Sequence, residues 1–90
     1  MKLQSLDKMK IGDVFIKGGS PGHVVLIVDM AENDKGEKIF MLAQSYMPAQ
    51  QTQILINPSD RELGVWYSLK GKDVLITPEW DFSLNQLRSF

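Results

Sequence analysis

The chain has 90 residues, a hydrophobic fraction of 43% and a formal net charge of −1. This length allows one domain with a thin core, and the scattered basic residues do not form the basic face that nucleic-acid binding requires. The sequence has one histidine and no cysteine, which excludes disulfides, a thiol nucleophile and the usual zinc sites, so no cofactor is expected.

Nothing in the sequence predicts a membrane span or a targeting signal. The longest unbroken apolar runs, 24–28 and 39–43, are much shorter than the ~20 residues that cross a bilayer. The first ten residues, MKLQSLDKMK, lack the apolar segment of a signal peptide. We therefore expect a domain without a transmembrane segment.

Short strands between turn signals dominate the first half of the chain. The predicted strand 13–17 leads through the loop GGSPG (18–22), whose glycines allow positive φ angles, into a second strand at 23–30. This second strand, HVVLIVDM, is apolar on both faces, which is typical of a central strand covered on both sides. The polar turn 31–37 then predicts a hairpin with a third strand at 38–46.

The second half continues the pattern. The segment 52–57 alternates as a further strand, and 65–69 and 74–77 flank the turn KGKD as a second predicted hairpin. Strands that follow one another through such short turns usually lie side by side. The first three predicted strands should therefore be consecutive antiparallel neighbours.

Helix is scarce in this sequence. The Ser-x-x-Glu spacing at 59–62, followed by Gly64, predicts about one helical turn, and Ser-x-x-Gln at 83–86 predicts another. The expected fold is mainly β (α+β at most), an antiparallel barrel-like sheet of five to six short strands with one-turn helices. We expect it to be a single domain over residues 1–90.

His23 is the only histidine and opens the second predicted strand. A hairpin turn centred near position 33 or 34 places Gln44 or Ser45 opposite this histidine, and the preceding loop brings Lys17 to its other side. An amide neighbour can hold an imidazole in one tautomer, as a general base requires. A half-buried histidine at a strand end is the commoner occurrence, and both interpretations stay open.

Other polar residues are candidates for ligand contact or chemistry. Ser45, Lys17 and Gln50 are candidate substrate-binding residues, because Ser45 and Lys17 are expected beside His23 and Gln50 lies in a glutamine-rich stretch. Ser20 and Ser45 also carry hydroxyl groups that can act as nucleophiles. No oxyanion hole accompanies either serine in the sequence, which favours ordinary loop and strand serines.

Three aromatic residues in the second half allow two interpretations. Trp66, Tyr67 and Trp80 can form a platform for a sugar or a peptide. Aromatic side chains in short strands are more often core residues. The sequence favours the core interpretation and leaves the platform open.

Three stretches make the chain resemble a known bacterial family. GDVFIKGGSPGHVVLIVD, FMLAQSYMPAQ and TPEWDF are similar to the domain-of-unknown-function 4846 family, which is found chiefly in Bacteroidetes. The resemblance covers about residues 11–90 and corresponds to the C-terminal part of the family's proteins. It implies that a longer segment precedes this region in the parent protein.

The order of a Gly-Asp strand, a Gly-His strand and a strand with a polar residue also resembles the NlpC-type papain-like cell-wall cysteine peptidases. This resemblance implies His23 as the catalytic base and Gln44 as the residue that orients it. It also implies a cell-envelope or secreted location for the parent protein. Those peptidases carry a nucleophilic cysteine on a helix upstream of these strands, whereas this chain has no cysteine.

Two functions remain. The chain is either a papain-like peptidase or amidase scaffold that is inactive alone, or a small β-barrel binding or protein-interaction module with a polar cleft around His23. A cell-wall peptide or glycan is the expected ligand. A sheet that is apolar on both faces needs cover on both, so we also expect a homodimer or strand-exchanged oligomer, or an upstream segment of the parent protein, as partner.

Overall fold

The computed structural model describes residues 2–17, 23–46, 51–78 and 80–89. Its strands are β1 (Lys2–Leu3), β2 (Val14–Lys17), β3 (His23–Glu32), β4 (Lys38–Tyr46), β5 (Gln51–Ile54), β6 (Trp66–Tyr67), β7 (Val74–Ile76), β8 (Asp81–Ser83) and β9 (Leu87–Ser89). The helical elements are two single 3-10 turns, η1 (Leu6–Lys8) and η2 (Leu84–Gln86). The mainly β prediction is therefore confirmed.

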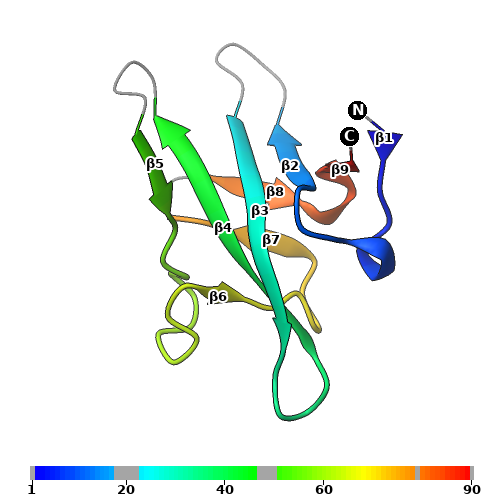
Figure 1. Cartoon of the computed structure of the whole chain (residues 1–90), viewed down its shortest axis with the longest axis vertical. Helices are drawn as coiled ribbons and strands as arrows, with labels where there is room; N and C mark the ends of the chain where they lie inside the picture. Colours follow the sequence, from blue (N-terminus) through cyan, green and yellow to red (C-terminus); the bar gives the residue numbers. More distant parts are fainter. Residues whose placement is uncertain (1, 18–22, 47–50, 79, 90) are drawn as a thin grey trace.

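The strands form two antiparallel sheets within the described residues. The main sheet has the order β1-β9-β2-β3-β4-β5, with β6 pairing with β4 beyond the end of β5. Strands β7 and β8 form a separate two-stranded sheet (Figure 1). The prediction that β2, β3 and β4 are consecutive antiparallel neighbours is confirmed.

Two features of the topology differ from the sequence prediction. The main sheet is open, with β1 and β5 at its ends, so no closed barrel is present among the described strands. The second predicted hairpin is also wrong, because β6 pairs with β4 and β7 pairs with β8. Burial explains the change: the ring of Tyr67 stacks on Phe40 at 5.9 Å between centroids, which holds β6 against the main sheet.

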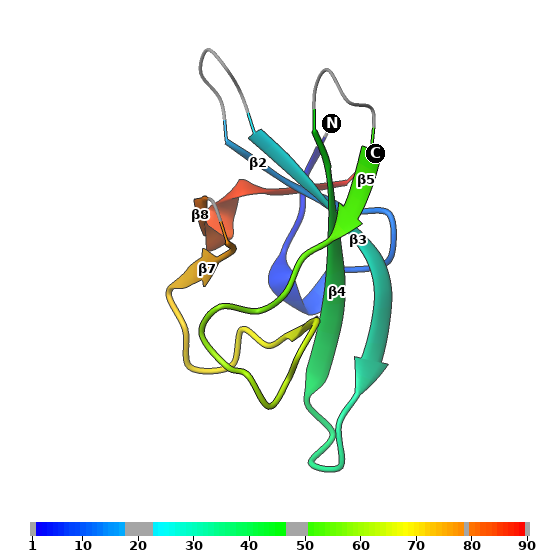
Figure 2. The same cartoon turned by 90° about the vertical axis from the view of Figure 1, so that its left-hand side faces the viewer.

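The core lies between the main sheet and the β7–β8 hairpin, which covers one face of that sheet (Figure 2). Phe15 joins the two layers, because its ring centroid lies 6.4 Å from that of Phe40 and 6.2 Å from that of Phe82. The buried core residues are Met9, Phe15, Val25, Ile27, Phe40, Leu42, Leu55, Tyr67, Leu75, Phe82 and Leu87.

Strand β3 is central but covered on one face only. Val25 and Ile27 point into the core and are 1% and 0% exposed, whereas Val24 and Leu26 are 48% and 37% exposed. The expected cover on both faces is therefore wrong. The β7–β8 hairpin is the second layer of the fold, and it lies on the side of Val25 and Ile27.

The turn between β3 and β4 is organised by Asn33. Its side-chain Oδ1 accepts hydrogen bonds from the backbone N–H groups of Lys35 and Glu37, each at 2.9 Å. Gly36 has a φ of +76°, which a glycine adopts without steric cost. The predicted hairpin is confirmed, and the turn is centred on Lys35, one to two residues later than expected.

The two predicted helical turns had different outcomes. At 83–86 the capping box is present, with the Ser83 N–H donating to Gln86 Oε1 at 2.8 Å, and one 3-10 turn follows. At 59–62 the helix prediction is wrong, because the Asn57 side chain accepts the Ser59 N–H at 2.9 Å and so stabilises a turn instead. No helix in the described part of the chain is long and apolar enough to span a membrane.

Candidate functional site

His23 lies against Trp80. Their rings are stacked, with centroids 3.6 Å apart and planes inclined by 22°. His23 opens β3 on its core-facing side and is half-buried, and Trp80 directly precedes β8. Because β3 and β8 belong to different sheets, this contact closes one end of the space between the two layers.

Lys17 lies beside His23, as the sequence predicted. The two residues are paired in the β2–β3 register, and the side chain of Lys17 is exposed. Its Nζ donates to the backbone oxygen of Asp81 at 3.5 Å. Two neighbouring strands of the main sheet therefore both contact the segment that enters β8, one through an aromatic ring and one through a cation.

Thr77 holds the backbone of Trp80 in place. The Thr77 Oγ1 hydroxyl donates to the Trp80 carbonyl at 2.5 Å and accepts the Trp80 N–H at 3.2 Å. The backbone N–H of Thr77 also donates to the same carbonyl at 3.0 Å. Thr77 is buried, so these three hydrogen bonds fix the backbone of Trp80 to a buried residue. Sequence reasoning missed this role, although the Thr-x-x-Trp spacing is visible in the stretch TPEW.

Gln44 lies on the same face of the main sheet as His23 but is not directly opposite it. The β3–β4 register pairs Leu26 with Ala43, and continuing that register places Gln44 opposite Val25. The predicted direct pairing is wrong, because the turn is centred on Lys35, later than predicted, and the register shift between Ile27 and Asp29 recovers only one residue of the difference. Gln44 is thus the diagonal neighbour of His23, at about 7 Å between Cβ atoms.

The side chain of Gln44 is buried, with an amide oxygen that is unpaired in the described part of the chain. It is 8% exposed, and its Oε1 is buried and has no hydrogen-bond partner among the described residues. Buried acceptors are nearly always paired, because leaving one unpaired costs about 1–3 kcal/mol. An unpaired amide oxygen on the His23 face is therefore a candidate ligand contact.

The remaining candidate residues are placed as follows. Ser20 and Gln50 lie outside the described residues, and only the backbone of Ser45 is described, in β4 opposite Thr52. The aromatic platform does not form as a single group: Tyr67 is buried on Phe40, the adjacent Trp66 points to the other side of β6, and Trp80 contacts His23.

The His23 stack constrains what this site can do. The indole covers one face of the imidazole, so polar contacts are left to the ring edge. Among the described residues, none forms a hydrogen bond with the His23 ring, and no three His, Cys, Asp or Glu side chains gather in a group that could hold a metal ion. The arrangement offers an aromatic surface, a cation and a buried acceptor.

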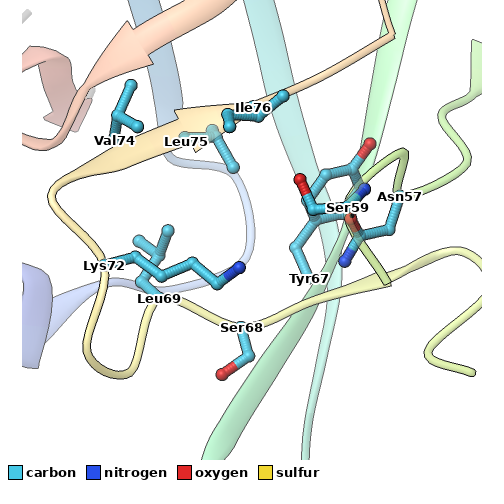
Figure 3. Close-up of a pocket in the computed structure, with 9 residues that line it drawn as sticks. All are labelled: Asn57, Ser59, Tyr67, Ser68, Leu69, Lys72, Val74, Leu75 and Ile76. Atoms are coloured by element: carbon cyan, nitrogen blue, oxygen red, sulfur yellow. Dashed lines mark hydrogen bonds between the residues drawn. The ribbon is translucent and has the colours of Figure 1, made fainter. Parts of the chain in front are cut away.

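A small cavity away from His23 lies between β6 and β7 and is lined by Asn57, Tyr67 and Lys72 among others (Figure 3). Its volume is about 20 Å³, close to the space of a single water molecule. Tyr67 donates its hydroxyl to the Ile56 carbonyl at 2.9 Å, and burial raises the pKa of Tyr67 to about 12. This cavity is too small for an organic ligand.

The comparisons with known proteins bear on the family. The model of a family described as a domain of unknown function (4846) matches residues 1–89. The chain belongs to this family. The family match includes the first ten residues, which the resemblance noted in the sequence did not cover. No curated protein and no solved structure matches the chain.

Proposed function

We propose that this domain is a binding module and that its ligand site is the corner formed by His23, Trp80, Lys17 and Gln44. The observation that carries the proposal is the buried Oε1 of Gln44, which has no hydrogen-bond partner within the part of the chain that the structure describes and lies on the same sheet face as the half-buried His23. A ligand that donates a hydrogen bond to this oxygen relieves the cost of burying it.

The chemistry of the corner favours a peptide ligand over a glycan. Gln44 Oε1 needs a donor such as a peptide N–H, and the exposed ammonium of Lys17 suits a carboxylate. Trp80 is 36% exposed and offers apolar surface to a side chain. A cell-wall stem peptide combines amides, small apolar side chains and free carboxylates, so we propose this class of ligand.

We further propose that the domain shares its scaffold with papain-like peptidases and has no hydrolytic activity alone. The position of His23 at the opening of β3, followed by buried Gln44 on β4, supports this relation. The chain has no cysteine to serve as a nucleophile, and a base without an activated nucleophile gives no acyl transfer. In this proposal His23 is retained as part of the binding surface.

The test is a titration of the chain with a stem tetrapeptide and, in parallel, with a chitin tetrasaccharide, followed by two-dimensional NMR. We expect saturable shifts with the peptide, centred on β3, β4 and the segment before β8. Gln44→Met and Trp80→Ala should each weaken peptide binding by about tenfold or more, which corresponds to ~1.4 kcal/mol.

Gln53→Met is the matched control, because Gln53 is paired with Gln44 in the β4–β5 register but is exposed. Gln44→Met should keep or raise the free energy of unfolding, since it removes an unpaired buried acceptor. Peptide binding that is unchanged in Gln44→Met and Trp80→Ala would refute the site. Release of hydrolysis products by the wild-type chain, abolished in His23→Ala, would instead support an enzyme.

A further inference from the structure

Strand β5 is an edge of the main sheet and pairs with β4 on one side only (Figure 1). It has four residues, whereas the other described strands with a single partner, β1, β6, β7 and β8, have two or three. An edge strand presents backbone N–H and C=O groups to any chain that can add a further strand. The longest such edge in the described part of the chain is therefore β5.

The register identifies which backbone groups of β5 point away from β4. The Leu55 N–H donates to the Leu42 carbonyl at 2.9 Å, next to the register pair of Ile54 and Ala43. In an antiparallel pair, hydrogen-bonded residues alternate with residues whose backbone groups point away from the partner strand. Thr52 and Ile54 therefore direct their N–H donors and C=O acceptors along the open edge.

The sequence of β5 does not block the addition of a strand. Natural edge strands are usually protected by lysines, prolines or bulges, whereas the stretch QTQILIN (51–57) has no charged residue and no proline. The register between β4 and β5 runs over four residue pairs without a shift. Ile54 and Ile56 are 45% and 64% exposed, so an added strand also gains apolar contact.

An open recess lies beside this edge. Its volume is about 350 Å³, which is within the size range of ligand sites. Most of its lining is apolar, and it contains no charged residue. The lining residues are Gln53, Ile54, Leu55, Ile56, Pro58 and Pro78. Because Ile54 belongs to both the open edge and the recess, a chain that pairs with β5 can place an aliphatic side chain there.

The size of the edge favours a short peptide over a folded partner. Four residues of strand extend roughly 13 Å. A second copy of the chain that paired through this edge alone would bury much less than the ~800 Å² per partner of a standard-size interface. A peptide does not need that area, because main-chain hydrogen bonds supply its affinity and alternate side chains its specificity.

We propose that β5 binds an extended peptide by strand addition. The peptide backbone pairs with Thr52 and Ile54, and an aliphatic side chain enters the recess beside Pro58 and Pro78. The fitting ligand is a segment of alternating apolar and uncharged polar residues, since neither the edge nor the recess carries a charge. The site does not depend on the His23 corner, because β4 lies between β5 and the strand that carries His23.

Titration of the chain with a hexapeptide of alternating threonine and valine, capped at both ends, tests the proposal by two-dimensional NMR. We expect saturable shifts along β5 and slower amide exchange at Thr52 and Ile54. Two N-methylated peptides are matched probes, one methylated at the threonines and the other at the valines. Alternate N–H groups of the peptide face β5, so one version should bind more than tenfold more weakly and the other should bind like the parent.

Ile54→Pro removes one outward N–H, a change that edge strands tolerate on their open side, and should weaken peptide binding more than tenfold. Ile76→Pro is the matched control and should leave binding unchanged. Ile76 is 40% exposed, and the bond from the Thr77 N–H to the Trp80 carbonyl continues the β7–β8 register so that the Ile76 N–H also points outward. The methylated peptides test the same bonds with the wild-type chain if a proline variant fails to fold.

Equal affinity for the two methylated peptides, or unchanged peptide binding in a folded Ile54→Pro variant, would overturn the proposal. Sedimentation velocity tests the other occupant: a dimer that is lost in Ile54→Pro would also overturn the proposal, since a second copy would then cover the edge. His23→Ala should leave binding of this peptide unchanged. Loss of binding in His23→Ala would place the peptide in the His23 corner and not on β5.

Discussion

The imidazole of His23 lies flat against the indole of Trp80, with 3.6 Å between the ring centroids. The two residues are 57 positions apart in the sequence; His23 is in the main sheet, and Trp80 directly precedes β8 of the other sheet. Because the chain has one histidine, the ring protons of His23 can be assigned without ambiguity. They therefore report on this contact directly.

We expect the His23 ring protons to be shifted upfield by the indole ring current. The shift should disappear in Trp80→Ala and persist in Trp66→Ala, since Trp66 lies on the other side of the sheet. His23→Ala should lower the free energy of unfolding by about 0.5–1.5 kcal/mol, the contribution of an aromatic pair. Random-coil shifts in the folded wild type would contradict the stacked geometry.

Thr77 is expected to control the position of Trp80. Thr77→Val keeps the shape of the side chain but removes the hydroxyl that bonds to both the carbonyl and the N–H of Trp80. Unfolding in urea should show a loss of about 1–3 kcal/mol, because the Trp80 N–H loses its acceptor and the Trp80 carbonyl keeps only the Thr77 N–H. The upfield shift of the His23 ring protons should also be smaller in Thr77→Val than in the wild type. Thr77→Ser, which keeps the hydroxyl, should retain most of the upfield shift of His23. An equal loss of this shift in both variants would argue against the role of the hydroxyl in positioning Trp80.

Asp13 is a buried carboxylate that stabilises the turn before β2. It is 1% exposed, accepts the Lys10 N–H at 3.0 Å and the Gln4 side-chain amide at 3.3 Å, and pairs with Lys10 Nζ at 3.3 Å. Asp13→Ala should lower the unfolding free energy by about 1–3 kcal/mol, since these donors lose their acceptor.

Two control variants separate the parts of the Asp13 interaction. Lys10→Met removes only the ion pair, and because the Lys10 side chain is 63% exposed the effect should stay below about 1 kcal/mol. Asp73→Asn, at an exposed position, should have no measurable effect. Chemical denaturation of the four proteins gives the comparison, and a Lys10→Met loss as large as that of Asp13→Ala would mean that the ion pair dominates.

Stability should fall at high pH because of Tyr67. Burial raises the pKa of Tyr67 from 10.0 to about 12, so below pH 10 both the folded and the unfolded chain keep the phenol protonated and this contribution is fully present. Between pH 10 and 12 the unfolded chain ionises first, and about 2–3 kcal/mol is lost as the pH rises through the folded pKa.

Tyr67→Phe isolates this effect from the deprotonation of lysines in the same range. At neutral pH the variant should be about 1 kcal/mol less stable than the wild type, because it lacks the hydrogen bond to the Ile56 carbonyl. The difference should shrink and then reverse between pH 10 and 12. Parallel stability curves from pH 9 to 12 would show that Tyr67 ionises equally in both states.

The sequence predicts the local part of the fold well. The β2–β3–β4 meander is encoded by its turn residues, and the Asn33 and Gly36 positions at one turn have the conformations that such residues favour. The capping box at 83–86 is likewise a local pattern. These features need only neighbouring residues, so composition and spacing suffice to find them.

The long-range part could not be predicted in the same way. Strand β6 pairs with β4 because Tyr67 stacks on Phe40, a choice that depends on the packed core rather than on the nearby turn KGKD. The contact of His23 with Trp80 likewise depends on how the two sheets meet. Gln44 was found on the correct face, but the later turn centre makes it diagonal to His23, and the one-residue register shift in β3 offsets only part of this change.

The place of β9 between β1 and β2 has a consequence for the order of folding. The β2–β3–β4 meander can pair as soon as residue 46 has been synthesised, whereas β1 has no partner and Phe15 lacks its register partner Leu87 until the last strand of the chain is available. Contacts that span so much of the sequence form slowly. During that interval the edge of β2 is unpaired, and this is the stage at which the nascent chain is most exposed to misassembly with other chains.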